Sequence, residues 1–408
     1  MALMNEATRI ATAAADIRAD TPVDTEWLHV QYTEKTGFTE TYGFAGSQGV
    51  VNLEGLLLRP RGRPSKTLLI FMHPASTLQL LPLPRALVQA GAHVLCAASR
   101  YAKNDAALIM EKVVLDLGAY VRHAKTLLGY EKVAIVGWSG GGSLAMFYQA
   151  EAESPSITHT PAGDPLDLTR AGLLPVDAVI FQAAHLSRGH LLLDSIDPSV
   201  LDELRPDHRD PDLDLYHSAN PQQPPYRADF IERYRAAQLA RMRRITATVK
   251  NTLADFQRRG GGEVERGFVV HRTLADPRYL DPTLDPNQRR PRWCYLGNPE
   301  TVNSGPVGLA RFCTLRSWLS QWSIDDARAD ALACAARITV PLLVIENGAD
   351  DAVPQPHLGR VFAAATSADK TMYLIDGATH YYAGQPAQLA EASRLIIGWL
   401  GARGLSAK

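Results

Sequence analysis

Short apolar runs alternate with amphipathic stretches in the first part of the chain and again near its end. The apolar runs have the length of strands, and we predict eight of them, at residues 27–32, 50–59, 67–72, 93–98, 132–136, 176–184, 340–346 and 370–375. The intervening stretches predict helices at 84–90, 105–128, 140–152, 355–364 and 385–400. The first two runs resemble an antiparallel pair joined by a glycine-containing turn at 43–49. The later alternation predicts an α/β fold with a mostly parallel central sheet flanked by helices.

The pattern changes after His185. Of the 26 prolines, 12 lie between Leu186 and Pro306, where strand runs are scarce and helices are predicted at 230–253 and 307–322. Because strands of one sheet flank this segment, we expect a large, mainly helical lid inserted after the sixth strand. The expected organisation is an N-terminal helical extension (1–26), an α/β core (27–185 and 323–408) and a lid (186–322).

The most specific motif is the pentapeptide from Gly137 to Gly141, which reads G-x-S-x-G around Ser139. It follows a buried strand and opens a helix, and this frame is typical of a nucleophile elbow. The two outer glycines are needed because the turn is tight and a Cβ would collide with neighbouring backbone. Neither a P-loop nor a dinucleotide-binding spacing fits this segment. We therefore predict that Ser139 is a nucleophile.

A serine hydroxyl needs a base to take its proton. His380 follows the last predicted strand and is the expected base. The acid is expected after the preceding strand, where Asp350 and Asp351 are adjacent. Asp350, four residues before Pro354, is preferred, and Asp351 is expected to cap the following turn. Backbone N–H groups of Gly140 and Ala75 are the expected oxyanion-hole donors, because Pro74 has no N–H.

These motifs resemble the α/β-hydrolase superfamily. The resemblance covers roughly residues 27–185 and 340–400, and rests on the Ser139 elbow, the His73-Pro74 loop, the 348–354 acid loop and the 378–380 loop. Many relatives have His-Gly where this chain has His73-Pro74, a departure that concerns the second oxyanion donor. The glycine triplet 140–142 and the segment 99–105 also look like uncharacterised bacterial hydrolases with long lids. The resemblance implies hydrolysis without a metal or another cofactor.

The leading hypothesis is a carboxylic-ester hydrolase that uses Ser139, His380 and Asp350 and forms an acyl-enzyme. Hydrolysis of a thioester or of a C–C bond by the same triad is the alternative. A non-catalytic binding protein on this scaffold is the rival from another class.

Ligands of such sheets bind at the carboxyl ends of the strands. The expected substrate-binding residues therefore follow strands or lie in the loops beside them, and they are Trp138, His73, Tyr101, Arg100, His185 and Tyr381. Asn104 and Asp105 resemble a helix N-cap. The arginines of the predicted helix at 230–253 could capture an anionic substrate, or could face water and pair with acids.

Composition narrows the class of partner. The chain has 42 basic and 43 acidic residues in 408, which argues against a nucleic acid, and it has no apolar stretch of membrane-spanning length. Its four cysteines lack metal or redox spacing and are expected to be buried thiols in the cytoplasm. No H-E-x-x-H motif is present, and the pair His185 and His190 is a weak metal candidate, so no metal site is expected. A small-molecule substrate is expected, and a homodimer is kept open.

Overall fold

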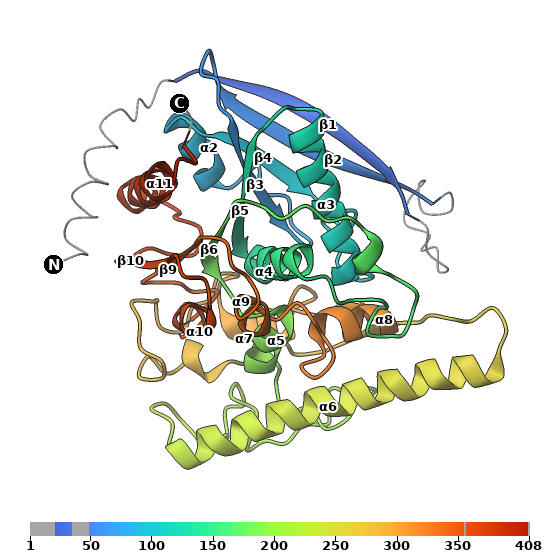
Figure 1. Ribbon diagram of the computed structural model, residues 1–408. Helices are drawn as coiled ribbons and strands as arrows, with labels where there is room; N and C mark the ends of the chain where they lie inside the picture. The colour runs from blue at the N-terminus through green and yellow to red at the C-terminus, as the bar shows by residue number, and fades with distance from the viewer. Residues whose placement is uncertain (1–20, 35–48, 355, 407–408) are drawn as a thin grey trace.

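The computed structural model describes residues 21–34, 49–354 and 356–406. Its main sheet has eight strands in the order β1-β2-β4-β3-β5-β6-β9-β10 (Figure 1). Their bounds are β1 Val23–Thr33, β2 Val50–Pro60, β3 Thr67–His73, β4 His93–Ala98, β5 Lys132–Ser139, β6 Ala178–Ala184, β9 Leu342–Asn347 and β10 Lys370–Ile375. β2 is antiparallel to both of its neighbours, and the remaining pairs are parallel. All eight predicted strands are present.

Helices cover both faces of the sheet. One face carries α2 (Pro82–Gln89) and α11 (Pro386–Gly401), and the other carries α3 (Met110–Thr126), α4 (Gly140–Glu153), α9 (Ala331–Ala335) and α10 (His357–Ala364). The alternation of side chains along a strand produces both cores. In β3, Ile70 and Met72 join the core beside α3 and α4, whereas Leu69 and Phe71 join the core beside α2 and α11.

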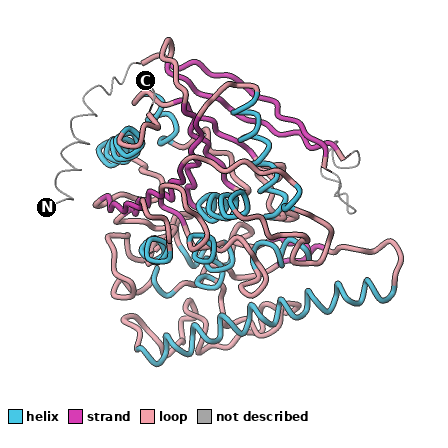
Figure 2. The backbone as a smooth tube through the Cα atoms, viewed as in Figure 1, coloured by secondary structure: helices cyan, strands magenta, loops and turns pink. Residues whose placement is uncertain are grey.

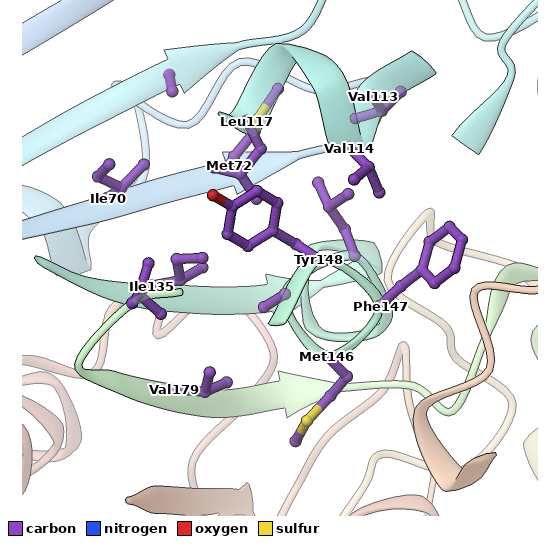
Figure 3. Packing of buried hydrophobic residues seen from close by; sticks show 14 of the residues in the cluster. Ile70, Met72, Val113, Val114, Leu117, Ile135, Met146, Phe147, Tyr148 and Val179 are labelled. Atoms are coloured by element: carbon purple, nitrogen blue, oxygen red, sulfur yellow. The ribbon is translucent and has the colours of Figure 1, made fainter. Parts of the chain in front are cut away.

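Figure 3 shows the first of these cores from close by. The Tyr148 side chain of α4 points toward the side chains of β3 and β5, and Val113, Val114 and Leu117 of α3 close the cluster from the other side. All of these side chains are buried. This packing gives α4, and the turn before it, a rigid support.

The segment between β6 and β9 forms a second layer across the end of the sheet, with the long helix α6 (Ala228–Arg259) running along its outer side (Figure 1). We call residues 186–322 the insertion. Its other elements are α5 (Arg188–Ser195), η3 (Pro277–Tyr279), α7 (Pro299–Ser304), α8 (Leu315–Ser317), η4 (Trp318–Trp322) and the strand pair β7 (Gly267–Val269) and β8 (Phe312–Thr314). Apart from α6, most of the insertion is loop (Figure 2), so the expectation of a mainly helical segment is met only in part. Its many Asp-Pro pairs favour turns over helices.

Two predicted helices differ in the structure. The helix expected at 307–322 is instead β8, the short α8 and a π-helical turn. The helix expected from Asp105 begins only at Met110, because residues before it bond to the insertion. The Ala106 carbonyl accepts hydrogen bonds from Thr314 N–H and from the Ser317 hydroxyl. These contacts take residues 105–109 out of the helix, and they remove the expected N-cap.

Two expectations concern the beginning of the chain. The N-terminal helix and the turn at 43–48 lie outside the described residues. β1 begins at Val23, so residues 23–26 belong to the sheet and not to the expected extension. Among the helices that the structure describes, none has the length and apolarity needed to cross a membrane.

Candidate active site

Ser139 lies at the junction between β5 and α4, on a backbone with φ 54° and ψ −125°. A non-glycine residue rarely adopts a positive φ, and such strain persists only where packing enforces it. The neighbouring glycines make the turn possible. A Cβ at Gly137 would lie 2.5 Å from Gly141 O, and a Cβ at Gly141 would overlap the Met72 carbonyl oxygen. The elbow therefore presents Ser139 at the carboxyl end of the sheet.

His380 and Asp350 form a buried pair beside this elbow. His380 Nδ1 lies 3.0 Å from Asp350 Oδ2, and both side chains are almost fully buried. The other carboxylate oxygen of Asp350 accepts the N–H groups of Ala352 at 2.9 Å and Val353 at 2.7 Å. A carboxylate at Nδ1 places the proton of the neutral imidazole there and leaves Nε2 as the acceptor. This is the tautomer that a general base requires.

Asp351 takes neither role suggested for it. It makes no hydrogen bond to the imidazole of His380, and the turn that it was expected to cap is capped by Asp350. Its Oδ1 is buried without a hydrogen-bond partner among the described residues. Burial and the nearby Asp350 carboxylate raise the pKa of Asp351 above its ordinary value.

Trp138 connects the elbow to the His380 loop. Its indole N–H donates to the His380 carbonyl oxygen at 3.2 Å, and its ring centroid lies 4.5 Å from that of His380. Tyr381 packs on both rings, with centroid distances of 5.3 Å to Trp138 and 5.0 Å to His380. Because Trp138 precedes Ser139 directly, these contacts hold the His380 loop close to Ser139. No hydrogen bond of the Ser139 hydroxyl is present within the described ranges.

The loop after β3 is organised by the His73 side chain. Its Nδ1 accepts the N–H groups of Ala75 at 3.1 Å and Ser76 at 2.9 Å. The neutral ring therefore carries its proton on Nε2, which would lie 2.6 Å from a Cβ at Gly140. Burial, with a smaller contribution from the Arg188 guanidinium, lowers the pKa of His73 to about 3. His73 thus stays neutral across the physiological range.

A cavity of about 190 Å³ lies between the core and the insertion. The core contributes Ser139, Trp138 and His73 to its wall, and the insertion contributes Arg188, Tyr295 and Trp322. A larger cavity of about 820 Å³ is confined to residues 201–315 of the insertion and contains none of the predicted triad. The smaller cavity is therefore the one next to the candidate nucleophile.

Comparisons with known proteins bear on the fold. No family model matches the chain, and no curated protein matches its sequence. Among solved structures, the complex of DcsB with its substrate analogue is 12% identical, with a TM-score of 0.50 over 93% of this chain and 99% of that one. The monoacylglycerol lipase of Paleococcus ferrophilus (16% identity, TM-score 0.44, 86% and 99% covered) and Est1E from Butyrivibrio proteoclasticus (14%, 0.43, 86% and 96%) also match.

The likeness to the DcsB structure, the strand order and the strand–turn–helix around Ser139 agree on one architecture. The chain has the α/β-hydrolase fold. In this fold the residues at the carboxyl ends of β5, β9 and β10 come together, and here these ends carry Ser139, Asp350 and His380. At such low identity the likeness extends to the fold alone.

Four of the six residues predicted to bind substrate line the cavity of this hydrolase fold. Trp138, His73, His185 and Tyr381 are all in its wall. The imidazole of His185 is fully buried, and burial followed by the charge of His357 lowers its pKa well below the ordinary value. Ala75, expected as an oxyanion donor, is also in the wall.

Arg100 and Tyr101 lie elsewhere, so their expected place in the pocket is wrong. Arg100 is buried in an ion-pair cluster with Asp116 at 2.8 Å and with Glu34. Its guanidinium also lies 5.8 Å from the Tyr32 ring. Tyr101 is fully buried in the core beside α3. The loop after β4 does reach the cavity, but through Asp105, whereas the side chains of Arg100 and Tyr101 are taken up by the Asp116 pair and the core.

The arginines of α6 do not line the cavity either. Arg235 pairs with Asp276 at 2.9 Å, and Arg243 pairs with Asp325 at 2.9 Å. Buried Arg241 pairs with an acid from a preceding loop of the insertion. The chain of contacts favours the interpretation of these arginines as partners of acids.

Arg188 lines the cavity, although the sequence pattern did not single it out. It begins α5, four residues after β6 ends, and its Nη2 donates to the Asp105 carboxylate. Its Cζ lies 4.2 Å from the Trp322 ring. The only sequence signal was its position just beyond a strand at the carboxyl edge of the sheet.

Proposed function

We propose that this chain is a serine hydrolase that cleaves a carboxylic ester of a small or medium organic substrate. The observation that carries the proposal is the buried His380–Asp350 pair, joined at 3.0 Å, next to a serine on a strained elbow. A strained backbone and a buried ionisable pair both cost stability, and they occur together mainly where chemistry is performed. Ser139 also lines the cavity of about 190 Å³ between the core and the insertion.

In the proposed reaction, Ser139 Oγ attacks the ester carbonyl carbon while His380 Nε2 takes the hydroxyl proton. Asp350 holds the Nδ1 proton and stabilises the imidazolium without accepting that proton. His380 then returns its proton to the departing alcohol, and an acyl-enzyme remains on Ser139. Water, deprotonated by His380, attacks the acyl carbonyl and releases the acid.

The oxyanion formed in these steps is proposed to accept hydrogen bonds from the Gly140 and Ala75 N–H groups. Gly140 is the first residue of α4, so its N–H has no acceptor within the helix. The Ala75 N–H is donated to His73 Nδ1, so an oxyanion must compete with that ring for it. His73 Nε2–H makes no hydrogen bond within the described residues and lies beside Gly140, where it adds a further donor.

The cavity limits the size of the substrate. A volume of about 190 Å³ lies below the range of about 300–1,000 Å³ that is usual for drug-sized ligands. We therefore propose a small acyl or alcohol group under the insertion, and a lid role for residues 186–322. The four buried, free cysteines support the proposal of a reducing cytoplasmic location. The homodimer remains a prediction.

The test is covalent labelling of Ser139 by a fluorophosphonate probe, together with turnover of p-nitrophenyl acetate and hexanoate. The wild-type chain should be labelled at Ser139, and Ser139→Ala should lose both labelling and turnover. Ser154→Ala, at the exposed far end of α4, is the matched control and should retain both. Undiminished turnover by Ser139→Ala would refute the proposal. Labelling without ester turnover would direct the search to thioesters or C–C bonds.

A further inference from the structure

Three buried nitrogen atoms around the active-site cavity have no hydrogen-bond partner within the described residues. They are Nε of Arg188, Nε1 of Trp322 and Nδ1 of His185. All three residues belong to the wall of the cavity that contains Ser139. Buried donors are nearly always paired in folded proteins, because an unpaired donor loses its hydration without compensation. Their concentration at one small cavity indicates that a bound group supplies the missing partners: acceptors for Arg188 and Trp322, and for His185 an acceptor in the tautomer that carries its proton on Nδ1.

The guanidinium of Arg188 is the strongest of these donors. The group has five N–H bonds. Among the described residues, only the Asp105 carboxylate accepts a hydrogen bond from it, at Nη2. Its Cζ lies 4.2 Å from the centroid of the Trp322 ring, a cation–π contact that adds to the ion pair in holding the group in place. Arg188 is thus held rigidly with most of its donors unused.

The charge balance at this position favours an anion. The Arg188 side chain is 8% exposed, whereas that of Asp105 is 40% exposed, so water screens the carboxylate more than the guanidinium. The carboxylate of Asp350 is already compensated by His380 and two N–H groups. The two histidines of the wall, His73 and His185, add no charge, because burial lowers the pKa of His73 to about 3 and that of His185 well below its ordinary value. The Arg188 guanidinium, offset only by the more exposed Asp105, is therefore the group of the wall that attracts an anion.

We infer that Arg188, with Trp322 Nε1–H and His185, forms a subsite for a carboxylate group of the substrate. Arginine offers two parallel N–H donors that match the two oxygens of a carboxylate, and the indole N–H adds a third donor. This inference rests on the proposed hydrolase function and specifies its substrate class. The preferred substrate is a small ester that carries a second, free carboxylate, such as a half-ester of a short dicarboxylic acid.

The first experiment compares charged and neutral esters of equal length. Monomethyl succinate, glutarate and adipate are each assayed beside methyl butanoate, pentanoate and hexanoate, with methanol release as the common readout. At the best chain length, kcat/KM for the half-ester should exceed that of its neutral partner about tenfold or more, as expected for hydrogen bonds to a charged group. Equal values at all three lengths would overturn the subsite.

The second experiment uses variants of the subsite. Arg188→Gln should lower the ratio of kcat/KM for the half-ester to kcat/KM for the neutral ester about 10- to 100-fold. Trp322→Phe keeps the ring under the guanidinium but removes the N–H, and should lower the same ratio about tenfold. Arg258→Gln, on the exposed end of α6, is the control and should change neither value. An equal loss on both esters in Arg188→Gln and Trp322→Phe would overturn the inference.

Labelling of Ser139 by the fluorophosphonate distinguishes a failure of the carboxylate subsite from a failure of the proposed hydrolase function. Labelled protein that cleaves both kinds of ester equally would refute the carboxylate subsite and leave the hydrolase function standing. Protein that is neither labelled nor active would refute the proposed function, and the subsite would fall with it. Normal labelling of Arg188→Gln and Trp322→Phe would show that their active sites remain assembled.

Discussion

Replacing Asp350 with asparagine should reverse the tautomer of His380. In the structure, one carboxylate oxygen of Asp350 accepts two backbone N–H groups and the other accepts His380 Nδ1. The amide oxygen of an asparagine must remain on the two N–H donors, so its NH2 group faces Nδ1. The imidazole then accepts a hydrogen bond at Nδ1 and carries its proton on Nε2, where it cannot receive the proton of Ser139.

The size of the effect follows from the two N–H donors. To recover the productive tautomer, the asparagine must turn its NH2 group toward them and leave both buried donors unpaired. At about 1–3 kcal/mol for each donor, the penalty is about 2–6 kcal/mol, which lowers kcat about 30- to 20,000-fold. Loss of the imidazolium-stabilising charge acts in the same direction, and wrong-tautomer variants of such triads lose about 10⁴-fold.

The assay is kcat for p-nitrophenyl acetate, with thermal unfolding as a check on folding. Asp351→Asn is the matched control, because it changes the adjacent carboxylate, which makes no hydrogen bond to the imidazole of His380. Its kcat should stay within about threefold of wild type, since the amide keeps the shape of the side chain and leaves the His380–Asp350 hydrogen bond in place. An Asp350→Asn enzyme with more than a third of the wild-type kcat would refute this reasoning. So would an Asp351→Asn enzyme that is impaired to the same degree.

Three further outcomes concern stability. Ser139→Gly should have a free energy of unfolding about 1 kcal/mol higher than Ser139→Ala, measured in urea, because glycine adopts a positive φ without strain. Equal stabilities of the two variants would show that the backbone at this position is not strained. Gly137→Ala should cost about 3 kcal/mol or more, since its Cβ would lie 2.5 Å from Gly141 O, and near-wild-type melting would show that the elbow can relax. Burial and the Asp350 carboxylate raise the pKa of Asp351, so the charged form of Asp351 destabilises the folded protein at any pH above its ordinary pKa. Asp351→Asn should therefore stabilise the protein at pH 7, and the gain should vanish below about pH 4, where Asp351 is neutral in both states. A gain that persists at pH 3 would disprove that cause.

The order of the core elements was predictable from local patterns. Strands buried on both faces appear as continuous apolar runs, and each run was found within a few residues of its position in the structure. Chain order and the ends of strands also predicted that His380 and an acid of the 350–351 pair meet at the edge of the sheet that carries Ser139, and His380 and Asp350 do pair there. Asp351 was a close competitor in the sequence. Only the three-dimensional path of the loop shows that Asp350 faces His380.

The insertion was located from the sequence, but its interior was not predictable. The helix expected at 307–322 is broken because Thr314 and Ser317 bond to Ala106, about two hundred residues away in the chain. Long-range contacts of this kind override helical propensity, and no local window records them. Arg100 illustrates the opposite error, since a residue just beyond a strand can satisfy its charge on Asp116 and never reach the cavity.

The sequence by itself determined the alternation of strands and helices and the strained turn at Ser139, since each depends on residues close together in the chain. The tertiary structure alone decided what surrounds Ser139. Arg188 and Trp322 are far apart in sequence, yet the guanidinium lies 4.2 Å from the indole ring, in the wall of the same cavity as Ser139. Packing of the insertion on the sheet creates that environment, because burial and pairing of charges depend on contacts between distant segments.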